Sequence, residues 1–95
     1  MKHCILVKWN SEVKDKKAIL PDILCIFDKL LVLDGINDIK LYENVVDRSN
    51  RFDLMICIEM EKSVLTIYDE SEPHHIWKEK YGKFVEKKAI FDFEE

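Results

Sequence analysis

The segment FDLMICIEM, residues 52–60, decides the fold. Its side chains alternate in character, which predicts a β-strand, because successive strand side chains point to opposite faces of a sheet. One face is an unbroken apolar row that we expect to pack under helices: Phe52, Leu54, Ile56, Ile58 and Met60. The other face carries Met55 and Cys57 between Asp53 and Glu59. This strand is therefore predicted to be apolar on one side and apolar at its centre on the other.

Three further strands are predicted on either side of this segment. Residues 2–9 alternate in the same way and divide between two faces: His3, Ile5, Val7 and Trp9 on one, Cys4, Leu6 and Lys8 on the other. Residues 39–46 form a second strand, and the polar run 47–51 is a turn that joins it to the strand at 52–60 as a hairpin. Residues 89–93 form the last strand.

The segment between about residues 15 and 33 predicts a helix. Its apolar residues recur at three- and four-residue spacing, as on the buried side of a helix: Leu20, Ile23, Leu24, Phe27, Leu30 and Leu31. Pro21 leaves two alternatives, because proline fits only the first turn of a regular helix. Either the regular helix begins there, or the helix bends at that point. Asp34-Gly35 then ends it.

The second half of the chain predicts a helix in two pieces. Residues 63–69 form a short helix, and Pro73 opens a longer one that runs to about residue 85. The charged runs 78–80 and 86–88 are expected on a solvated helix face.

The order strand, helix, strand, strand, broken helix, strand is that of the ferredoxin-like α+β fold, with a four-stranded antiparallel sheet. Helices cover only one face of such a sheet. The opposite face is predicted to keep an apolar centre, made of Cys4, Leu6, Met55, Cys57 and one or both of Phe91 and Phe93. A contiguous apolar patch of this kind marks a subunit interface. We therefore expect a homodimer in which two open sheets pack face to face as a dimeric α+β barrel.

Composition narrows the class of protein. Ninety-five residues allow one domain, 1–95, and 47% apolar residues with two Gly and two Pro indicate a packed globular core. The net charge of −4, from 15 basic and 19 acidic residues, argues against nucleic acid or an anionic membrane as a partner. No apolar stretch approaches the roughly 20 residues of a membrane span, so a soluble, cytoplasmic protein is expected.

The cysteines and histidines predict no metal site. Cys4, Cys25 and Cys57 lie in apolar segments and are predicted to be reduced core thiols. His74 and His75 are adjacent, so on a helix they diverge by about 100° and do not form the i, i+4 pair of a zinc site.

Five segments resemble the stress-responsive A/B barrel (Dabb) family. Residues 1–9, MKHCILVKW, resemble its opening strand, which begins with a Lys-His pair, an aliphatic run and then Lys-aromatic. Residues 34–36 lie where the family ends its first helix, residues 52–54 resemble the start of its third strand, and residues 89–93 resemble its closing strand. Residues 68–74 resemble the tyrosine and proline-histidine stretch that opens its last helix. The resemblance covers nearly the whole chain and implies a dimeric α+β barrel.

The resemblance also implies candidate site residues. A plant polyketide cyclase of the family uses histidines and a tyrosine, in a pocket between sheet and helices, to promote an aldol ring closure. Aligned without gaps, Tyr68 matches its pocket tyrosine and His74 its pocket histidine, whereas alignment on the proline alone selects His75. His3 matches the first-strand histidine. Another pocket histidine of the cyclase corresponds to Leu54, so the chain departs from the pattern there.

Aromatic and aliphatic side chains would form the walls of the implied pocket. On the last helix His74, Trp77 and Tyr81 share one face at three- and four-residue spacing. With His3, the predicted ligand-binding residues are Ile5, Val7, Phe27, Leu54, Ile56, Trp77 and Tyr81. The competing interpretation is that all of these are core residues, with Tyr68 packed by its ring and His74 satisfying a helix end.

Two functions follow from these residues. We favour a stress-responsive homodimer that binds a small, partly aromatic or hydrophobic molecule between sheet and helices. The alternative is a cofactor-independent cyclase or isomerase, with His74 as the base and Tyr68 orienting a carbonyl. Neither implies a cofactor. The enzyme requires Tyr68 and His74 to converge on a connected cavity, and it fails if Trp9, Phe27 and Trp77 fill that space.

Overall fold

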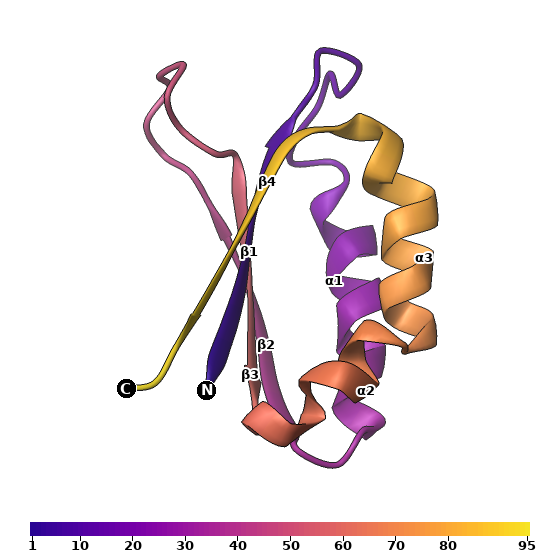
Figure 1. The fold of residues 1–95 in the computed structure, drawn as a ribbon. Helices are drawn as coiled ribbons and strands as arrows, with labels where there is room; N and C mark the ends of the chain where they lie inside the picture. The colour runs from indigo at the N-terminus through magenta and orange to yellow at the C-terminus, as the bar shows by residue number, and fades with distance from the viewer.

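The computed structural model describes residues 1–95 as a layer of helices packed on one layer of sheet (Figure 1). The helices and strands are β1 (Lys2–Trp9), α1 (Leu20–Asp28), β2 (Ile36–Glu43), β3 (Leu54–Met60), α2 (Leu65–Asp69), α3 (Glu72–Tyr81) and β4 (Val85–Phe93). Short 3-10 turns follow α1 and α3 and precede α2. All strand pairs are antiparallel, in the order β2-β3-β1-β4. The predicted ferredoxin-like α+β fold is therefore confirmed.

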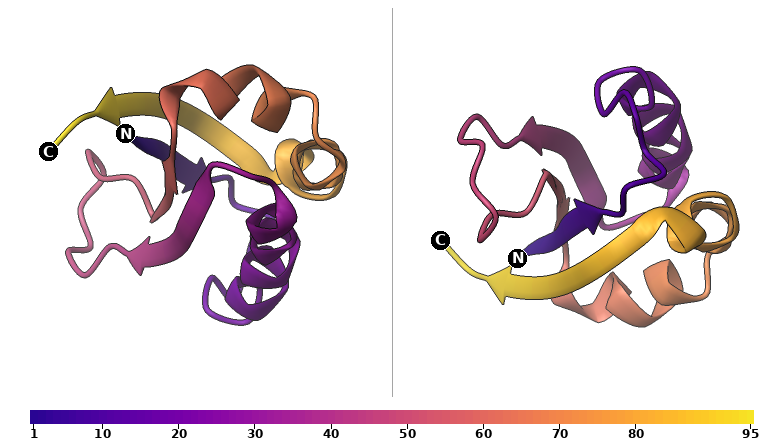
Figure 2. Two further views of the ribbon diagram at one scale, coloured as in Figure 1. Left: turned by 90° about the horizontal axis from the view of Figure 1, so that it is seen from below. Right: turned by 90° about the horizontal axis from the view of Figure 1, so that it is seen from above.

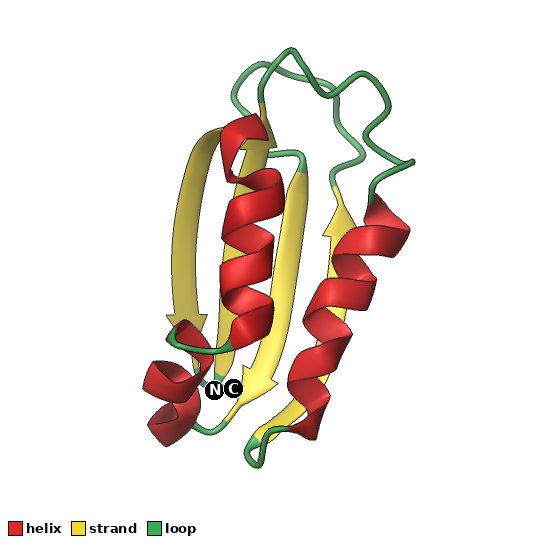
Figure 3. Cartoon of the chain, turned by 90° about the vertical axis from the view of Figure 1, so that its right-hand side faces the viewer, coloured by secondary structure: helices red, strands yellow, loops and turns green.

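The three helices all lie on one face of the sheet. Figure 3 shows them in front of the strands, and Figure 1 shows the other face bare. The end-on views show the twist of the sheet, with no helix on this second face (Figure 2). Between the two layers lies a core of 17 buried apolar residues, to which the central strands β1 and β3 contribute alternate side chains. None of the helices combines the length and the apolar composition that a membrane crossing requires.

The first helix is shorter than the predicted span of residues 15–33. It begins at Leu20 with Pro21 in its first turn, which is the first of the two alternatives. The residues before it do not join the helix, because the Asp15 carboxylate accepts hydrogen bonds from two following backbone N–H groups and closes a local turn. Regular helix ends at Asp28 and tightens into a 3-10 turn. Gly35, with φ of +89°, then turns the chain into β2.

The hairpin of β2 and β3 has a long loop in place of the predicted turn at 47–51. Strand β2 begins at Ile36 rather than residue 39, and the connection spans residues 44–53, leaning away from the helices (Figure 1). The strand predicted from residue 52 begins at Leu54. The Asp53 N–H still donates to the Val7 carbonyl, while its carboxylate accepts a hydrogen bond from the Trp9 N–H and forms an ion pair with Lys16.

The last strand begins four residues earlier than predicted, at Val85 instead of residue 89. Helix α3 ends at Tyr81, and a 3-10 turn leads directly into β4. Pairing of Val85 with Trp9, across an irregularity in register, extends β4 along the whole of β1. The charged run 86–88 consequently lies exposed on an edge strand, so its assignment to a helix face was wrong. Charges on an edge strand oppose pairing with a further sheet.

The three cysteines do not all lie in the core. Cys4 is buried and Cys57 is half-buried, but Cys25 is exposed on α1, contrary to the prediction. The buried stripe of α1 consists of Ile23, Ile26 and Phe27, so the Cys25 side chain points outward. Leu24 and Leu31, predicted in the buried stripe, are exposed as well.

Candidate functional site

Tyr68 lies where the short helix α2 packs on the sheet. Its side chain is 1% exposed, and its Oη is the one buried side-chain polar atom without a hydrogen-bond partner. Leaving a buried hydroxyl unpaired costs about 1–3 kcal/mol. Burial, and to a lesser extent the charge of Asp69, raises the pKa of Tyr68 well above its ordinary value. The hydroxyl therefore keeps its proton at neutral pH and is available as a donor.

His3 contacts Tyr68 from the helix-facing side of β1. The two ring centroids are 5.3 Å apart in an edge-on arrangement. The Nδ1 atom of His3 lies 2.5 Å from Oδ1 of Asp92, which stands opposite His3 in the β1–β4 register. Sequence reasoning missed Asp92. Alternation in residues 89–93 carries the signal, because Asp92 must face the helices when Phe91 and Phe93 face the other way.

His74 completes the cluster from the first turn of α3. Its ring centroid is 4.8 Å from that of Tyr68, and its Nδ1 donates to the backbone carbonyl of Asp69 at 2.9 Å. Since a carbonyl only accepts, Nδ1 carries the ring proton and Nε2 is the acceptor. Desolvation lowers the pKa of His74, so the ring is neutral at pH 7. His75, the competing candidate, has an exposed side chain; His74 is the one that contacts Tyr68.

The remaining predicted ligand-binding residues are close-packed in the core. Each is at most 5% exposed: Ile5, Val7, Phe27, Leu54, Ile56, Trp77 and Tyr81. Trp77 contacts Trp9 and Phe27, with ring centroids 6.1 and 5.3 Å apart, so these aromatic side chains fill the space between α1, α3 and the sheet. None of the main cavities is lined by His3, Tyr68 or His74, so the connected cavity that the enzyme requires is not among them. A cavity of about 430 Å³ lies beside these three residues, at Ile67 and residues 70–73.

Tyr81 is not brought to the cluster around Tyr68. Its Oη donates to Oδ2 of Asp22 at 2.5 Å, and Lys80 binds the same carboxylate oxygen at 2.7 Å. These bonds tie α3 to α1. Hydrogen bonds from Lys80 and then Tyr81 lower the pKa of Asp22, while burial and the bond to Asp22 raise that of Tyr81. In this structure the Tyr81 hydroxyl links helix α3 to helix α1.

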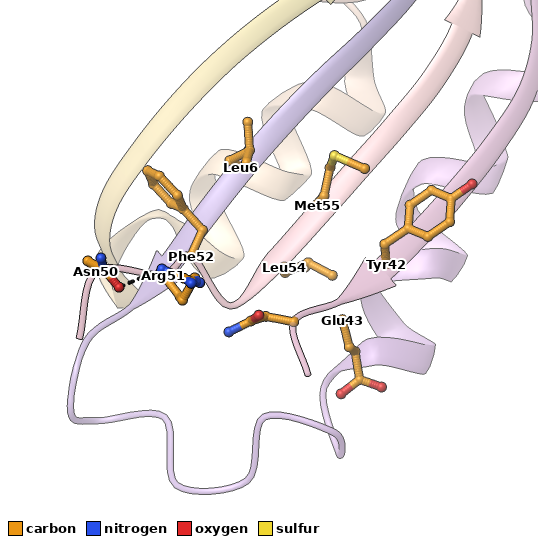
Figure 4. A pocket seen from close by; sticks show the side chains of 9 residues that line it. Leu6, Tyr42, Glu43, Asn50, Arg51, Phe52, Leu54 and Met55 are labelled. Atoms are coloured by element: carbon orange, nitrogen blue, oxygen red, sulfur yellow. Dashed lines mark hydrogen bonds between the residues drawn. The ribbon is translucent and has the colours of Figure 1, made fainter. Parts of the chain in front are cut away.

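The bare face of the sheet holds the largest of the main cavities and a smaller one beside it. A cavity of about 510 Å³ lies over its centre, lined mainly by Cys4, Leu6, Tyr42, Met55, Cys57, Phe91 and Phe93. A second, of about 300 Å³, adjoins it where the 44–53 loop meets the strands, and Figure 4 shows Leu6, Tyr42, Phe52 and Met55 around it. Phe52, predicted under the helices, thus lies on this side.

This open face has the apolar centre predicted from the sequence. Phe91 is 64% exposed and Tyr42 47% exposed. Both Phe91 and Phe93 belong to the patch, which settles the choice between them. Tyr42 was missed, although it lies within the strand predicted at residues 39–46; its position in the β2–β3 register places it beside Met55. Lys2 and Glu95 line one end of the hollow.

A metal ion has no evident place in the chain. No group of three or more His, Cys, Asp or Glu side chains is arranged to hold one.

Comparison with known proteins shows similarity in fold. No protein-family model matches the sequence, and no curated protein is significantly similar to it. Solved structures match over nearly the full chain. A dimeric protein of unknown function with a ferredoxin-like fold from Bacteroides fragilis is 17% identical, with a TM-score of 0.78 and coverage of 99% of this chain and 94% of that one.

Two more matches show how varied proteins of this fold are. A dabb family protein with a ferredoxin-like fold from Mesorhizobium loti is 14% identical (TM-score 0.74; 99% and 94% covered). A hydroxynitrile lyase from Passiflora edulis is also 14% identical (TM-score 0.74; 97% and 89% covered). Other matching ferredoxin-like proteins are dimeric as well. The chain therefore has the ferredoxin-like α+β fold. Its structural neighbours include several dimeric proteins and a dabb family protein.

Proposed function

We propose that this protein is a Dabb-type homodimer that binds a small, partly aromatic or hydrophobic molecule beside Tyr68. The fold shared with a dabb family protein, together with the resemblance of the sequence segments, supports the family assignment. The dimeric neighbours and the apolar open face support pairing of two sheets face to face. A stress-responsive role remains a prediction from the resemblance, and a cytoplasmic location remains a prediction from the sequence composition.

The observation that carries the ligand proposal is the unpartnered Oη of Tyr68. A guest with a carbonyl oxygen would accept its hydrogen bond and remove the cost of the unpaired hydroxyl. Next to it, the acceptor Nε2 of His74 suits a hydroxyl on the same guest. The apolar and aromatic side chains of the surrounding core suit an aromatic body.

Binding in this place requires a local opening, because Tyr68 and His3 are buried. Helix α2 is the element best suited to move. It has five residues and no side-chain hydrogen bond at its N-cap, and a helix of little more than one turn has little stability of its own. We therefore expect backbone amides of α2 to exchange with solvent faster than those of α1 and α3, and a bound guest to slow that exchange.

Acetophenone tests the ligand proposal, since it combines one aromatic ring with one acceptor oxygen. The readout is the shift of the His74 and His3 imidazole NMR signals on titration, with ethylbenzene as the probe that lacks the acceptor. Acetophenone should shift these signals in the native protein and bind roughly 3- to 10-fold more weakly to Tyr68→Phe, the value of one hydrogen bond. Tyr81→Phe, which alters a tyrosine bonded to Asp22, is the matched control. Equal binding to Tyr68→Phe and to the native chain would refute the role of Oη.

The cyclase or isomerase alternative is not favoured. Proton transfer by His74 and Tyr68 needs a substrate held between them in a connected cavity, and Trp9, Phe27 and Trp77 fill the adjoining space. The hydroxynitrile lyase neighbour does not change this, because a shared fold hosts unrelated reactions.

A further inference from the structure

Two cysteines face each other across the central strands of the sheet. Cys4 on β1 is directly opposite Cys57 on β3, and their Sγ atoms are 3.1 Å apart. Both side chains line the hollow of about 510 Å³ on the open face. The third cysteine, Cys25, lies on α1 and has no part in this pair.

The strand register places the pair in a geometry that a disulfide can adopt. The backbone N–H of Met60 bonds to the carbonyl of Met1, so Met1 and Met60 form a hydrogen-bonded pair. Hydrogen-bonded and non-hydrogen-bonded pairs alternate along an antiparallel ladder, so Cys4 and Cys57, three positions further on, form a non-hydrogen-bonded pair. The Cα atoms of such pairs are about 4.5 Å apart, at the short end of the range found in disulfides.

From this juxtaposition we propose that Cys4 and Cys57 form a reversible thiol–disulfide site, which a small-molecule disulfide such as oxidised glutathione converts to a β1–β3 cross-link. Short cross-strand geometry strains the bond and makes it easier to reduce than an ordinary structural disulfide. The site is independent of the ligand proposed beside Tyr68, because it lies on the other face of the sheet.

The order of the two steps follows from exposure. Cys57 is half-buried and lines the hollow, so its thiolate attacks one sulfur of the small disulfide and releases one thiol. Cys4 then loses its proton to solvent and attacks the Cys57 sulfur, which forms the internal disulfide and releases the second thiol. Two protein thiols are oxidised and one disulfide is reduced to two thiols.

The second step is expected to be slow. Cys4 is 3% exposed, and desolvation, followed by its hydrogen bond to Cys57, raises the pKa of Cys4 to about 12. Little thiolate is then present at neutral pH. In the proposed dimer the partner subunit covers this face, so oxidised glutathione reaches Cys57 only in the dissociated chain, and the reaction is measured after long incubation.

Intact-mass spectrometry of the Cys25→Ser variant tests the site, with the exposed third thiol removed. After long incubation with oxidised glutathione and alkylation of remaining thiols, the chain should be two hydrogens lighter, carry no alkyl group and return to the original state with dithiothreitol. The cross-link closes a loop over a separation of 53 residues, so Tm should rise by about 10 °C or more.

Two further variants identify the partners. Adding Cys4→Ser or Cys57→Ser to Cys25→Ser should abolish the internal cross-link and the rise in Tm. A Cys25→Ser chain that keeps both thiols, or that stops at a glutathione adduct on Cys57, would overturn the proposal. So would a cross-link that forms without any change in Tm.

Discussion

Replacing Tyr68 by phenylalanine should stabilise the protein. The change keeps the buried ring but removes the one buried side-chain polar atom that has no partner. An unpaired buried hydroxyl costs about 1–3 kcal/mol, and the small void left by the oxygen offsets part of the gain. We expect a net rise of about 1 kcal/mol in the free energy of unfolding, which for a domain of this size raises Tm by roughly 4–8 °C.

Tyr81→Phe is the matched comparison, because this tyrosine is also buried but its Oη donates to Asp22 at 2.5 Å. Removing that hydroxyl should lower the free energy of unfolding by about 1.5–3 kcal/mol, the range for a hydrogen bond to a charged group. Thermal and guanidinium unfolding, followed by circular dichroism at pH 7 and one protein concentration, measure both variants without added ligand. If Tyr68→Phe is less stable than the native chain, its Oη has a partner and the reasoning behind the ligand site is refuted.

Three other substitutions test an ion pair, a backbone turn and the dimer interface. Because the hydrogen bond from Lys80 lowers the pKa of Asp22, the stabilisation by this carboxylate is complete at pH 7 and is lost as pH falls below about 4, so Asp22→Asn should destabilise the protein at pH 7 and much less near pH 3. Gly35→Ala should cost roughly 2 kcal/mol or more in urea unfolding, since φ is +89° and a Cβ would lie 2.4 Å from a valine Cγ2. Phe91→Lys should shift the dimer toward monomer in gel filtration, whereas Val32→Lys, exposed beside the helices, should not.

The strands at the centre of the sheet were the elements that the sequence predicted best. Alternation alone gave β1 at residues 2–9 with its final bounds, because the side chains on its helix-facing side are buried and those on the other side are mostly half-buried. The strands at the edges were predicted with wrong starts. Strand β4 carries the charged run 86–88, which resembles a solvated helix and becomes a strand only by pairing with β1. Local periodicity does not predict the pairing of strands that are distant in the sequence.

The loop at 44–53 was missed for a similar reason. Its polar residues indicate a turn, but the loop is held by contacts with distant segments, such as those of the Asp53 carboxylate with the Trp9 N–H and Lys16. Such a long-range hydrogen bond has no signal in the surrounding residues. The sequence therefore predicted the existence of the hairpin and not its length.

The sequence predicted which residues form the candidate site better than it predicted how they are packed. The resemblance selected His3, Tyr68 and His74, and the structure brings these three rings together. It did not predict that the aromatic residues meant to line a cavity would fill it, because the same residues suit a pocket wall and a packed core equally well. Nor could it predict the missing partner of Tyr68 Oη, since hydrogen bonding depends on atomic positions.

The open face of the sheet, with Phe91 and Tyr42 exposed on it, is expected to pack against a second copy of the chain. Sedimentation equilibrium at micromolar concentration tests it most directly. We expect a species with twice the chain mass of 11.3 kDa. A stable species of 11.3 kDa at that concentration would contradict it.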